Sequence, residues 1–387
     1  MFLSRLRFSL SLAALFWTGT ALGSLAQEAQ QSAPATAAPR IEVVFVLDTT
    51  GSMADLIEGA KQKIWSITNM MIDLNPEAEI AFGLIGYRDL DDEYVTKVHP
   101  LSNDVQGIFS HLRRFEADGG GDTPEAVNEA LAEAINKIQW SEPKDQGQDS
   151  RRILFLVGDA PPHMDYANGP KYQTLLKRAR DKGLVVNSIQ AGDDPETEAY
   201  WREIAQMGGG RYMAIAQDGG QIRKIPTPFD EKIIEVQAKI DDTILPYGSQ
   251  SEISSLEAKL SDRKAASAEI QADNSSYYAK KAGKKEAVTG GGDLVGDIAN
   301  GEVSLDTLAE DLLPEEIKAL PKPERAALIE KQIEIRKGFE AEMADLVAKR
   351  DAFLAEESAK ETSSGDQSFE RSVKEMLQEQ LAPPQKP

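Results

Sequence analysis

The sequence has no cysteine among its 387 residues. The protein therefore has no disulfide bond, no thiolate metal site and no cysteine nucleophile, and a lipid anchor on an N-terminal cysteine is excluded as well. Histidine is nearly as scarce, with only His99, His111 and His163. There is no zinc-binding signature, no Ser-His-Asp order and no glycine loop followed by lysine. The usual signatures of zinc enzymes, serine hydrolases and nucleotide-binding loops are thus missing.

The chain has fewer basic residues than acidic ones. The chain carries 43 lysines and arginines against 64 acidic residues, a formal net charge of -21. Such a surface repels phosphate backbones and attracts cations. Nucleic-acid binding is therefore not expected, and divalent cations are favoured as ligands.

The N-terminus has the pattern of an export signal. Arg5 and Arg7 precede an apolar run over residues 8–17, and small residues follow. This predicts a signal peptide over residues 1–26 that is cleaved after Ala26. No twin-arginine pair is present, so we expect export by the general route and a periplasmic or secreted protein.

Two alternatives remain for this segment. Cleavage could follow Gly23 instead, or the segment could stay uncleaved as an anchor, the one case in which we expect contact with a membrane. Residues 27–39 are rich in glutamine, alanine and proline, a composition typical of a disordered leader.

The first strong structural signal is a strand followed by a polar turn. Residues 41–47 are apolar on both faces, as in a central parallel strand covered by helices on both sides. Asp48, Thr50 and Ser52 follow, and an amphipathic helix begins after Met53. Ligands of open α/β sheets bind at the carboxyl ends of strands, and this oxygen cluster suits a small divalent cation. The alternative interpretation is a simple helix cap.

Two further stretches favour the cation. Residues 119–125, GGGDTPE, open another predicted helix, with Pro124 in the first turn of a helix extending to Gln139. Residues 153–159 form a second buried strand that ends in Asp159. Three stretches resemble the three loops of a von Willebrand factor type A domain with a metal-ion-dependent adhesion site. They are DTTGSM at residues 48–53, the glycine-rich loop with Asp122, and the turn at Asp159.

The resemblance extends over about residues 40–217. The variants GYRD at residues 86–89, GDTPE at residues 121–125 and GDAPPH at residues 158–163 are similar to the branch that includes the A domain of α-kinase-linked proteins. The resemblance implies an α/β fold with a doubly wound, mostly parallel sheet flanked by helices.

The resemblance also implies ligands for the cation. Thr50 and Ser52 would bind it directly, whereas Asp48 and Asp159 would bind it directly or through water. The second loop would contribute a threonine in the family, but here Asp122 falls closest to that position and Thr123 is next to it. The implied cation is Mg²⁺ or Ca²⁺, with Mn²⁺ as a further choice. An extra carboxylate at Asp122 would favour Ca²⁺ and weaken the attraction for an acidic partner.

Three other residues are candidates for the mouth of the site. His163 lies four residues after Asp159 and is the one histidine placed to act as a general base, although an exposed loop position is the simpler interpretation. Arg88 and Asp89 follow a strand and could steady the metal loops as an ion pair, or could form an ordinary surface pair.

The remaining pattern defines five segments. After the signal and the leader, alternating strands and helices predict the A domain over residues 40–245, closed by an amphipathic helix at residues 229–245 that packs on the sheet. Residues 246–360 predict a helical region whose longest helix, residues 324–354, favours a small bundle or hairpin over a long coiled coil. The composition of residues 361–387 predicts a largely disordered tail, apart from a helix near residues 369–380.

Three functions compete at this point. The resemblance favours an exported, non-enzymatic module that captures an acidic group, Asp or Glu, of a protein partner through the cation. The alternatives are a metal-assisted hydrolase that uses His163 and a metal-independent scaffold that acts through the helical tail.

Overall fold

The computed structural model describes residues 39–142, 150–217, 225–281, 289–360 and 369–381. The predicted signal peptide and nearly all of the predicted leader lie outside these residues, as does most of the predicted loop between Ser141 and Ser150. Within the described residues, no helix combines the length and the apolarity that a membrane crossing requires.

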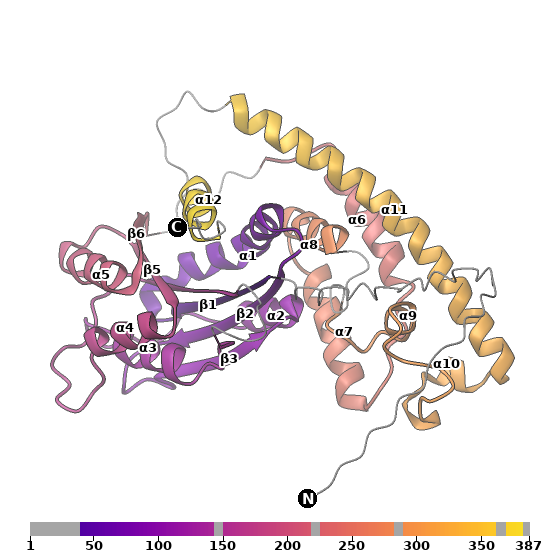
Figure 1. Ribbon diagram of the computed structural model, residues 1–387, viewed down its shortest axis with the longest axis horizontal. Coiled ribbons are helices and arrows are strands. Elements are labelled where there is room, and N and C mark those ends of the chain that lie inside the picture. Colours follow the sequence, from indigo (N-terminus) through magenta and orange to yellow (C-terminus); the bar gives the residue numbers. More distant parts are fainter. Residues whose placement is uncertain (1–38, 143–149, 218–224, 282–288, 361–368, 382–387) are drawn as a thin grey trace, which may run out of the picture. The chain divides into compact units, whose positions relative to one another are not determined.

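A six-stranded sheet forms the centre of the domain, in the order β3-β2-β1-β4-β5-β6 (Figure 1). All neighbouring strands are parallel except the edge strand β3, which runs antiparallel to β2. The predicted doubly wound, mostly parallel sheet is therefore confirmed. The strands are β1 (Arg40–Asp48), β2 (Glu79–Tyr87), β3 (Thr96–Ser102), β4 (Ser150–Gly158), β5 (Leu184–Ala191) and β6 (Gly209–Ile215).

Helices cover both faces of the sheet, and the alternation of side chains along β1 explains why. Val43 and Leu47 pack into one apolar cluster with α1 and α2, whereas Val44 and Val46 pack into a second cluster with α3, α4 and α5. Successive side chains of a strand point to opposite faces, so a strand buried on both sides needs apolar residues throughout. These helices are α1 (Ala54–Leu74), α2 (Val105–Arg113), α3 (Val127–Asn136), α4 (Tyr172–Asp181) and α5 (Pro195–Gly208).

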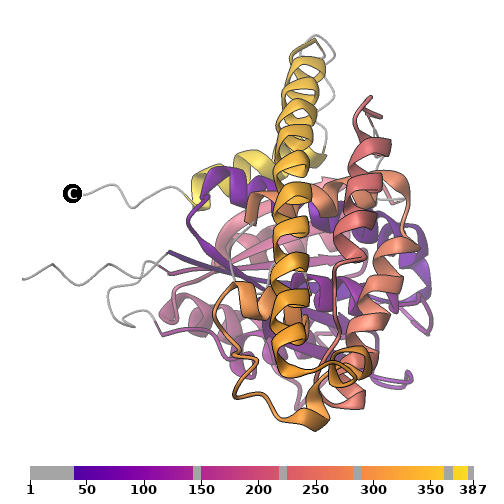
Figure 2. The same ribbon diagram turned by 90° about the vertical axis from the view of Figure 1, so that its right-hand side faces the viewer.

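Seven further helices follow the sheet in the described part of the chain. They are α6 (Asp230–Asp241), α7 (Gln250–Lys264), α8 (Ala268–Lys281), α9 (Leu294–Ala299), α10 (Glu315–Lys318), α11 (Lys322–Lys360) and α12 (Phe369–Gln380), with the 3-10 turns η1 (Gly51–Met53) and η2 (Glu310–Leu312) elsewhere. The long α11 runs beside α6 and also contacts α8 (Figure 2). The long helix α11 therefore packs against other helices, but its main partner, α6, comes from the segment that the sequence assigns to the A domain.

The helix predicted at residues 229–245 does not pack on the sheet as its pattern suggests. The apolar face of α6, with Ile233, Val236 and Ile240, packs against Ala272 of α8 and against α11. The amphipathic pattern predicts a buried face, but the pattern does not say which neighbour buries that face.

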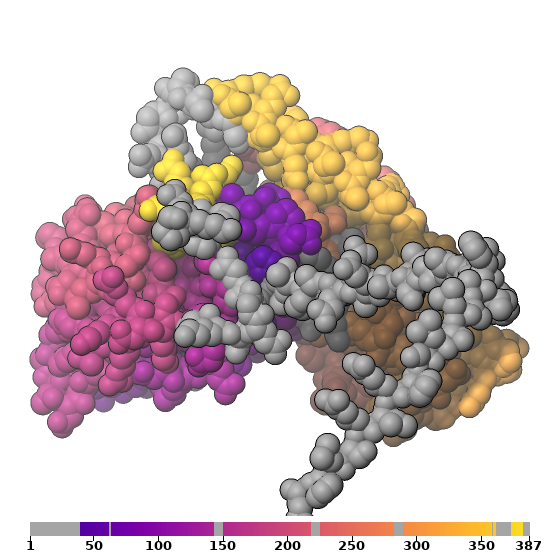
Figure 3. Space-filling view, in the orientation of Figure 1, coloured from indigo at the N-terminus to yellow at the C-terminus, as the bar shows by residue number. Residues whose placement is uncertain are grey.

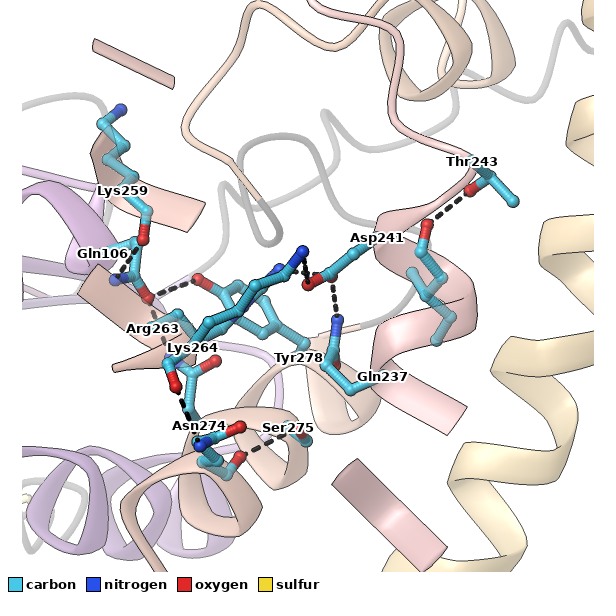
Figure 4. A network of polar contacts seen from close by, with 12 residues as sticks. Gln106, Gln237, Asp241, Thr243, Lys259, Arg263, Lys264, Asn274, Ser275 and Tyr278 are labelled. Carbon is cyan, nitrogen blue, oxygen red and sulfur yellow. Dashed lines mark hydrogen bonds and ion pairs between the residues drawn. The ribbon is translucent and has the colours of Figure 1, made fainter. Parts of the chain in front are cut away.

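The helical region is joined to the sheet domain by a buried polar network centred on Gln106 of α2 (Figure 4). The Gln106 amide donates to the Lys259 carbonyl of α7 at 3.3 Å and accepts from Asn274 of α8 at 2.9 Å. Nearby, Arg263 of α7 binds Asp241 of α6 in a buried ion pair. Because polar groups out of water need partners, this network fixes how α7 and α8 lie against α2.

The helix predicted near residues 369–380 is present as α12, and it completes the sheet domain. It lies against α1 and β6 (Figure 3). Val373, Met376 and Leu377 are buried in the same apolar cluster as α1 and the sheet. Asn187 of β5 and Gln380 exchange two amide hydrogen bonds of 3.1 and 2.7 Å. The C-terminal segment thus contributes to the core of the domain.

Replacing Leu377 with Ala should destabilise the protein because it opens a cavity under α12. Buried leucine-to-alanine changes cost about 2–5 kcal/mol of unfolding free energy, whereas Gln378→Ala, on the exposed side of the same helix, should change it by less than about 0.5 kcal/mol. Urea denaturation of the full chain measures both. Equal stability of the two variants would show that α12 does not pack on the domain.

Candidate metal centre

The polar turns that follow β1 and β4 meet at the carboxyl edge of the sheet, beside the end of β2. In the parallel register, Asp48 lies beside Tyr87 of β2, and Leu47 lies beside Val157 of β4. The turns after β1 and β4 are therefore neighbours, and they carry Asp48 and Asp159. Adjacent parallel strands bring their carboxyl ends to one edge, so the pairing of β1 with β4 brings Asp48 and Asp159 together.

The turn after β1 gathers its oxygen atoms tightly. The Thr50 amide and the Thr50 hydroxyl both donate to Asp48 Oδ1, at 2.9 and 2.7 Å. The hydroxyl oxygens of Thr50 and Ser52 lie 3.2 Å apart. Asp48 and Thr50 are buried, whereas Ser52 is exposed. Asp48, Thr50 and Ser52 thus present three side-chain oxygens within a single turn, as predicted from their spacing.

Asp159 is brought to the same turn, and a residue that sequence reasoning missed connects them. Gln217 follows β6, and its side-chain nitrogen donates to Asp159 Oδ2 at 2.6 Å and to the Ser52 carbonyl at 3.4 Å. A single amide nitrogen therefore contacts the first and third loops. Nothing in the sequence near Gln217 marks it, because a glutamine after an edge strand has no distinguishing pattern.

The second loop differs from the prediction. The sequence places Pro124 in the first turn of a helix extending to Gln139, but α3 begins at Val127, and the Thr123–Pro124 peptide is cis. The reason is that Glu125 is extended: its amide donates to the Pro161 carbonyl at 3.0 Å, and its carbonyl accepts from the His163 amide at 3.1 Å. This pairing holds the second loop against the turn after β4.

Glu125 is the second residue that sequence reasoning missed. Its side chain turns toward the first loop, because a Cβ on Gly120 would lie 2.9 Å both from Glu125 Oε1 and from Thr50 Cβ. Glu125 Oε2 and Asp48 Oδ2 are buried without a hydrogen-bond partner among the described residues. The GDTPE motif identifies this loop. Because the sequence predicts a helix start at Pro124, it does not indicate that Glu125 faces the first loop. We refer to Asp48, Thr50, Ser52, Asp159 and Glu125 as the Asp48 site.

The carboxylates of the Asp48 site repel one another. Burial, with a contribution from the charge of Asp159, raises the pKa of Asp48 to about 7, although hydrogen bonds from Thr50 oppose the rise. Burial and the charge of Asp48 raise the pKa of Glu125 to about 9. A divalent cation would remove this repulsion. The oxygen-only donors and the two orphaned carboxylate oxygens therefore fit Mg²⁺ or Ca²⁺.

The remaining predicted residues gather beside this site. Asp89, Asp122 and His163 each offer a ligand atom, and these atoms lie within 4.8 Å of one another. The sequence favours an exposed loop position for His163, but this residue is 4% exposed. It is held by the pairing of its loop with Glu125. Thr123, the alternative second-loop ligand, is exposed. That Asp122 or Thr123 binds the cation of the Asp48 site stays a prediction.

Arg88 is buried and does not pair with Asp89 among the ion pairs of the described residues. Its guanidinium donates to the carbonyls of Thr49 and Glu116, at 3.2 and 3.0 Å, and lies over the Tyr94 ring at 4.4 Å. Arg88 therefore ties the first loop to the segment that leads into the glycine loop. In place of the ion pair suggested with Asp89, Arg88 lies 3.6 Å from Glu93 and 4.0 Å from Asp118; that it steadies metal loops stays a prediction.

Comparison with known families identifies the domain. Residues 42–225 match the family described as von Willebrand factor A domain. The chain contains a von Willebrand factor A domain. Proteins with such domains are generally adhesion or scaffold modules that mediate protein–protein interactions, and a divalent cation at the adhesion site is a feature of the family.

Two curated relatives share part of this domain. An α-protein kinase, vwkA, from Dictyostelium discoideum is 26% identical over 136 residues, covering 35% of this chain and 20% of the kinase. The ariadne-like RING finger protein R811 of Acanthamoeba polyphaga mimivirus is 26% identical over 123 residues, covering 32% of this chain and 11% of that protein. The chain thus spans a minor part of either relative.

A solved structure is also similar to part of the chain. Proximal thread matrix protein 1 from the mussel byssus, with a zinc-occupied adhesion-site motif, is 14% identical. The similarity covers 47% of this chain and 43% of that one, with a TM-score of 0.32.

Replacing Glu125 with Gln should separate cation binding from folding. Without divalent cations at pH 7, the free energy of unfolding should change little, because a pKa of about 9 keeps the Glu125 carboxyl group neutral there. At a Mg²⁺ concentration of a hundred times Kd, the wild type gains about 2.7 kcal/mol, and the variant should lose most of this gain. Thermal unfolding with and without Mg²⁺ measures both. A full gain in the variant would exclude Glu125 from the site.

Proposed function

We propose that the protein is an exported adhesion or scaffold module whose Asp48 site holds Mg²⁺ or Ca²⁺ and captures an acidic side chain of a protein partner through the cation. Mn²⁺ would fit the same oxygen donors. The predicted signal peptide supports a location in the periplasm or outside the cell, where millimolar divalent cations are available.

One observation carries the proposal. Asp48 Oδ2 and Glu125 Oε2 are buried, lack a hydrogen-bond partner among the described residues, and belong to loops that also present Thr50, Ser52 and Asp159. Buried carboxyl oxygens that lack a partner are costly, so two of them in one cluster support a cation that binds there. Ser52 is exposed, which leaves one side of the cluster open to a partner.

The partner's chemistry follows from the cation's incomplete coordination. The side chains of the Asp48 site supply only part of the six to eight oxygen ligands that Ca²⁺ takes or the octahedral shell of Mg²⁺. A carboxylate from the partner is the hard, charged oxygen donor that fits the remaining position. The three carboxylates already present weaken this attraction, so we expect moderate affinity and a dependence on the cation concentration.

The two alternatives have less support. A hydrolase using His163 would need the imidazole to reach a substrate, but the side chain of His163 is only 4% exposed. A metal-independent scaffold would act through α6–α11 and leave the buried carboxylates of the Asp48 site without a role. Both alternatives are distinguishable by experiment.

A pull-down from the exported fraction tests the proposal. The wild-type chain should retain a partner in Mg²⁺ or Ca²⁺ and release it in EDTA, and Asp48→Ala and Ser52→Ala should reduce retention by at least about tenfold, because each removes a cation ligand. Asp193→Ala, an exposed acid after β5, is the matched control and should bind as the wild type does.

Two results would favour the alternatives. Retention that survives both EDTA and Asp48→Ala supports a scaffold acting through the helical region and overturns the proposal. Turnover of an ester, peptide or phosphate substrate that is lost in Asp48→Ala supports the hydrolase.

A further inference from the structure

We propose that Asp89, Asp122 and His163 form a second cation site, here called the His163 site, which is distinct from the Asp48 site and takes a transition-metal ion of the Zn²⁺ class. The three residues come from three loops: the turn after β2, the glycine loop before α3, and the loop after β4. The proposal does not depend on the function proposed above.

The distances fit such an ion. His163 Nε2 lies 3.5 Å from Asp89 Oδ2, and the ligand atoms of all three residues lie within 4.8 Å of one another. Zn–N and Zn–O bonds of about 2.1 Å in tetrahedral geometry place neighbouring ligand atoms roughly 3.4 Å apart. The His163–Asp89 edge already has this length. Asp122 is exposed and needs only a side-chain adjustment to close the triangle.

The burial and the hydrogen bonding of His163 indicate that its side chain binds a ligand. Its side chain is only 4% exposed, yet Nε2 has no hydrogen-bond partner among the described residues. The other ring nitrogen, Nδ1, lies 2.8 Å from Asp165 Oδ1. With the proton on Nδ1 donated to Asp165, the lone pair of Nε2 points toward Asp89. A histidine that donates to a carboxylate through one nitrogen and binds a metal through the other is the usual arrangement in protein metal sites.

Tyr166 holds both Asp89 and His163 in place. Its hydroxyl donates to Asp89 Oδ1 at 3.0 Å, and its ring stacks on His163 with centroids 4.0 Å apart. Asp89 Oδ1 is thereby engaged, and Oδ2 remains for a cation. One tyrosine thus fixes both the carboxylate and the imidazole, so two of the three ligands are held in place before any ion binds.

The donor set separates the two sites chemically. The Asp48 site offers oxygen alone, which suits Mg²⁺ and Ca²⁺, whereas an imidazole with two carboxylates suits Zn²⁺, Co²⁺ or Mn²⁺. If Asp122 belongs to the His163 site, Glu125 and Thr123 are left as the contributions of the second loop to the Asp48 site. The sites share loops, since Asp122 precedes Glu125 by three residues and His163 follows Asp159 by four.

Cobalt titration of the full chain tests the proposal. Co²⁺ takes the place of Zn²⁺ and gives visible absorption that reports its ligands. With Mg²⁺ in large excess to occupy the Asp48 site, the wild type should bind one Co²⁺ that Zn²⁺ displaces. His163→Gln and Asp122→Asn should each weaken Co²⁺ binding by at least about tenfold, and Asp165→Asn, at the residue that positions His163, should weaken it by about 10–100-fold.

Two control variants distinguish the His163 site from nearby acids and from the Asp48 site. Asp91→Asn removes an exposed acid from the same loop as Asp89 and should leave Co²⁺ binding unchanged. Ser52→Ala should keep the cobalt absorption, which distinguishes failure of this proposal from failure of the proposed function.

If His163→Gln does not fold, as judged by circular dichroism, Asp122→Asn is the deciding variant, because the Asp122 side chain is exposed. Absence of saturable Co²⁺ binding in the wild type, unchanged binding in Asp122→Asn, or loss of the absorption in Ser52→Ala would each overturn the proposal.

Discussion

Burial of carboxylates, together with their mutual repulsion, is the constraint that governs the carboxyl edge of this sheet. Asp48 and Asp159 end neighbouring strands, and Glu125 is brought to them by its backbone pairing with the turn after β4. The packing leaves no room to relax: a Cβ on Gly158 would lie 2.4 Å from the Tyr87 hydroxyl and 3.0 Å from Asp48. The sheet therefore holds these acids close together, and a bound cation would relieve the repulsion among them.

The C-terminal segment belongs to the same structural unit as this site. The described residues from 39 onward belong to one compact unit, and α12 lies on α1, the helix that follows the Asp48 turn. Helix α12 also contacts β5, because its Gln380 exchanges hydrogen bonds with Asn187. A helix far away in the sequence thus buries apolar surface against α1, the helix that begins directly after the turn with Thr50 and Ser52. The helical region is tied to the domain independently, through Gln106 and its partners on α7 and α8.

The sequence predicts the sheet and the first loop well, because both depend on local patterns. Strands buried on both faces need unbroken apolar runs, and the spacing of Asp48, Thr50 and Ser52 determines that their oxygens meet. The roles of Glu125 and Gln217 could not be predicted in this way, since each depends on a contact between loops far apart in the sequence. The predictions for the packing of α6 and for the exposure of His163 are wrong for the same reason. Amphipathic or polar patterns show that a surface is buried or exposed on average, but tertiary contacts decide which partner covers it.

The central claim is that the three loops hold one divalent cation at the Asp48 site. The most direct measurement is the anomalous difference density of a crystal of the protein soaked in Mn²⁺, which binds the same oxygen donors as Mg²⁺. We expect a peak within about 2.0–2.6 Å of the Ser52 hydroxyl and among the carboxylates of Asp48, Asp159 and Glu125. Saturating Mn²⁺ without a peak among these residues would contradict it.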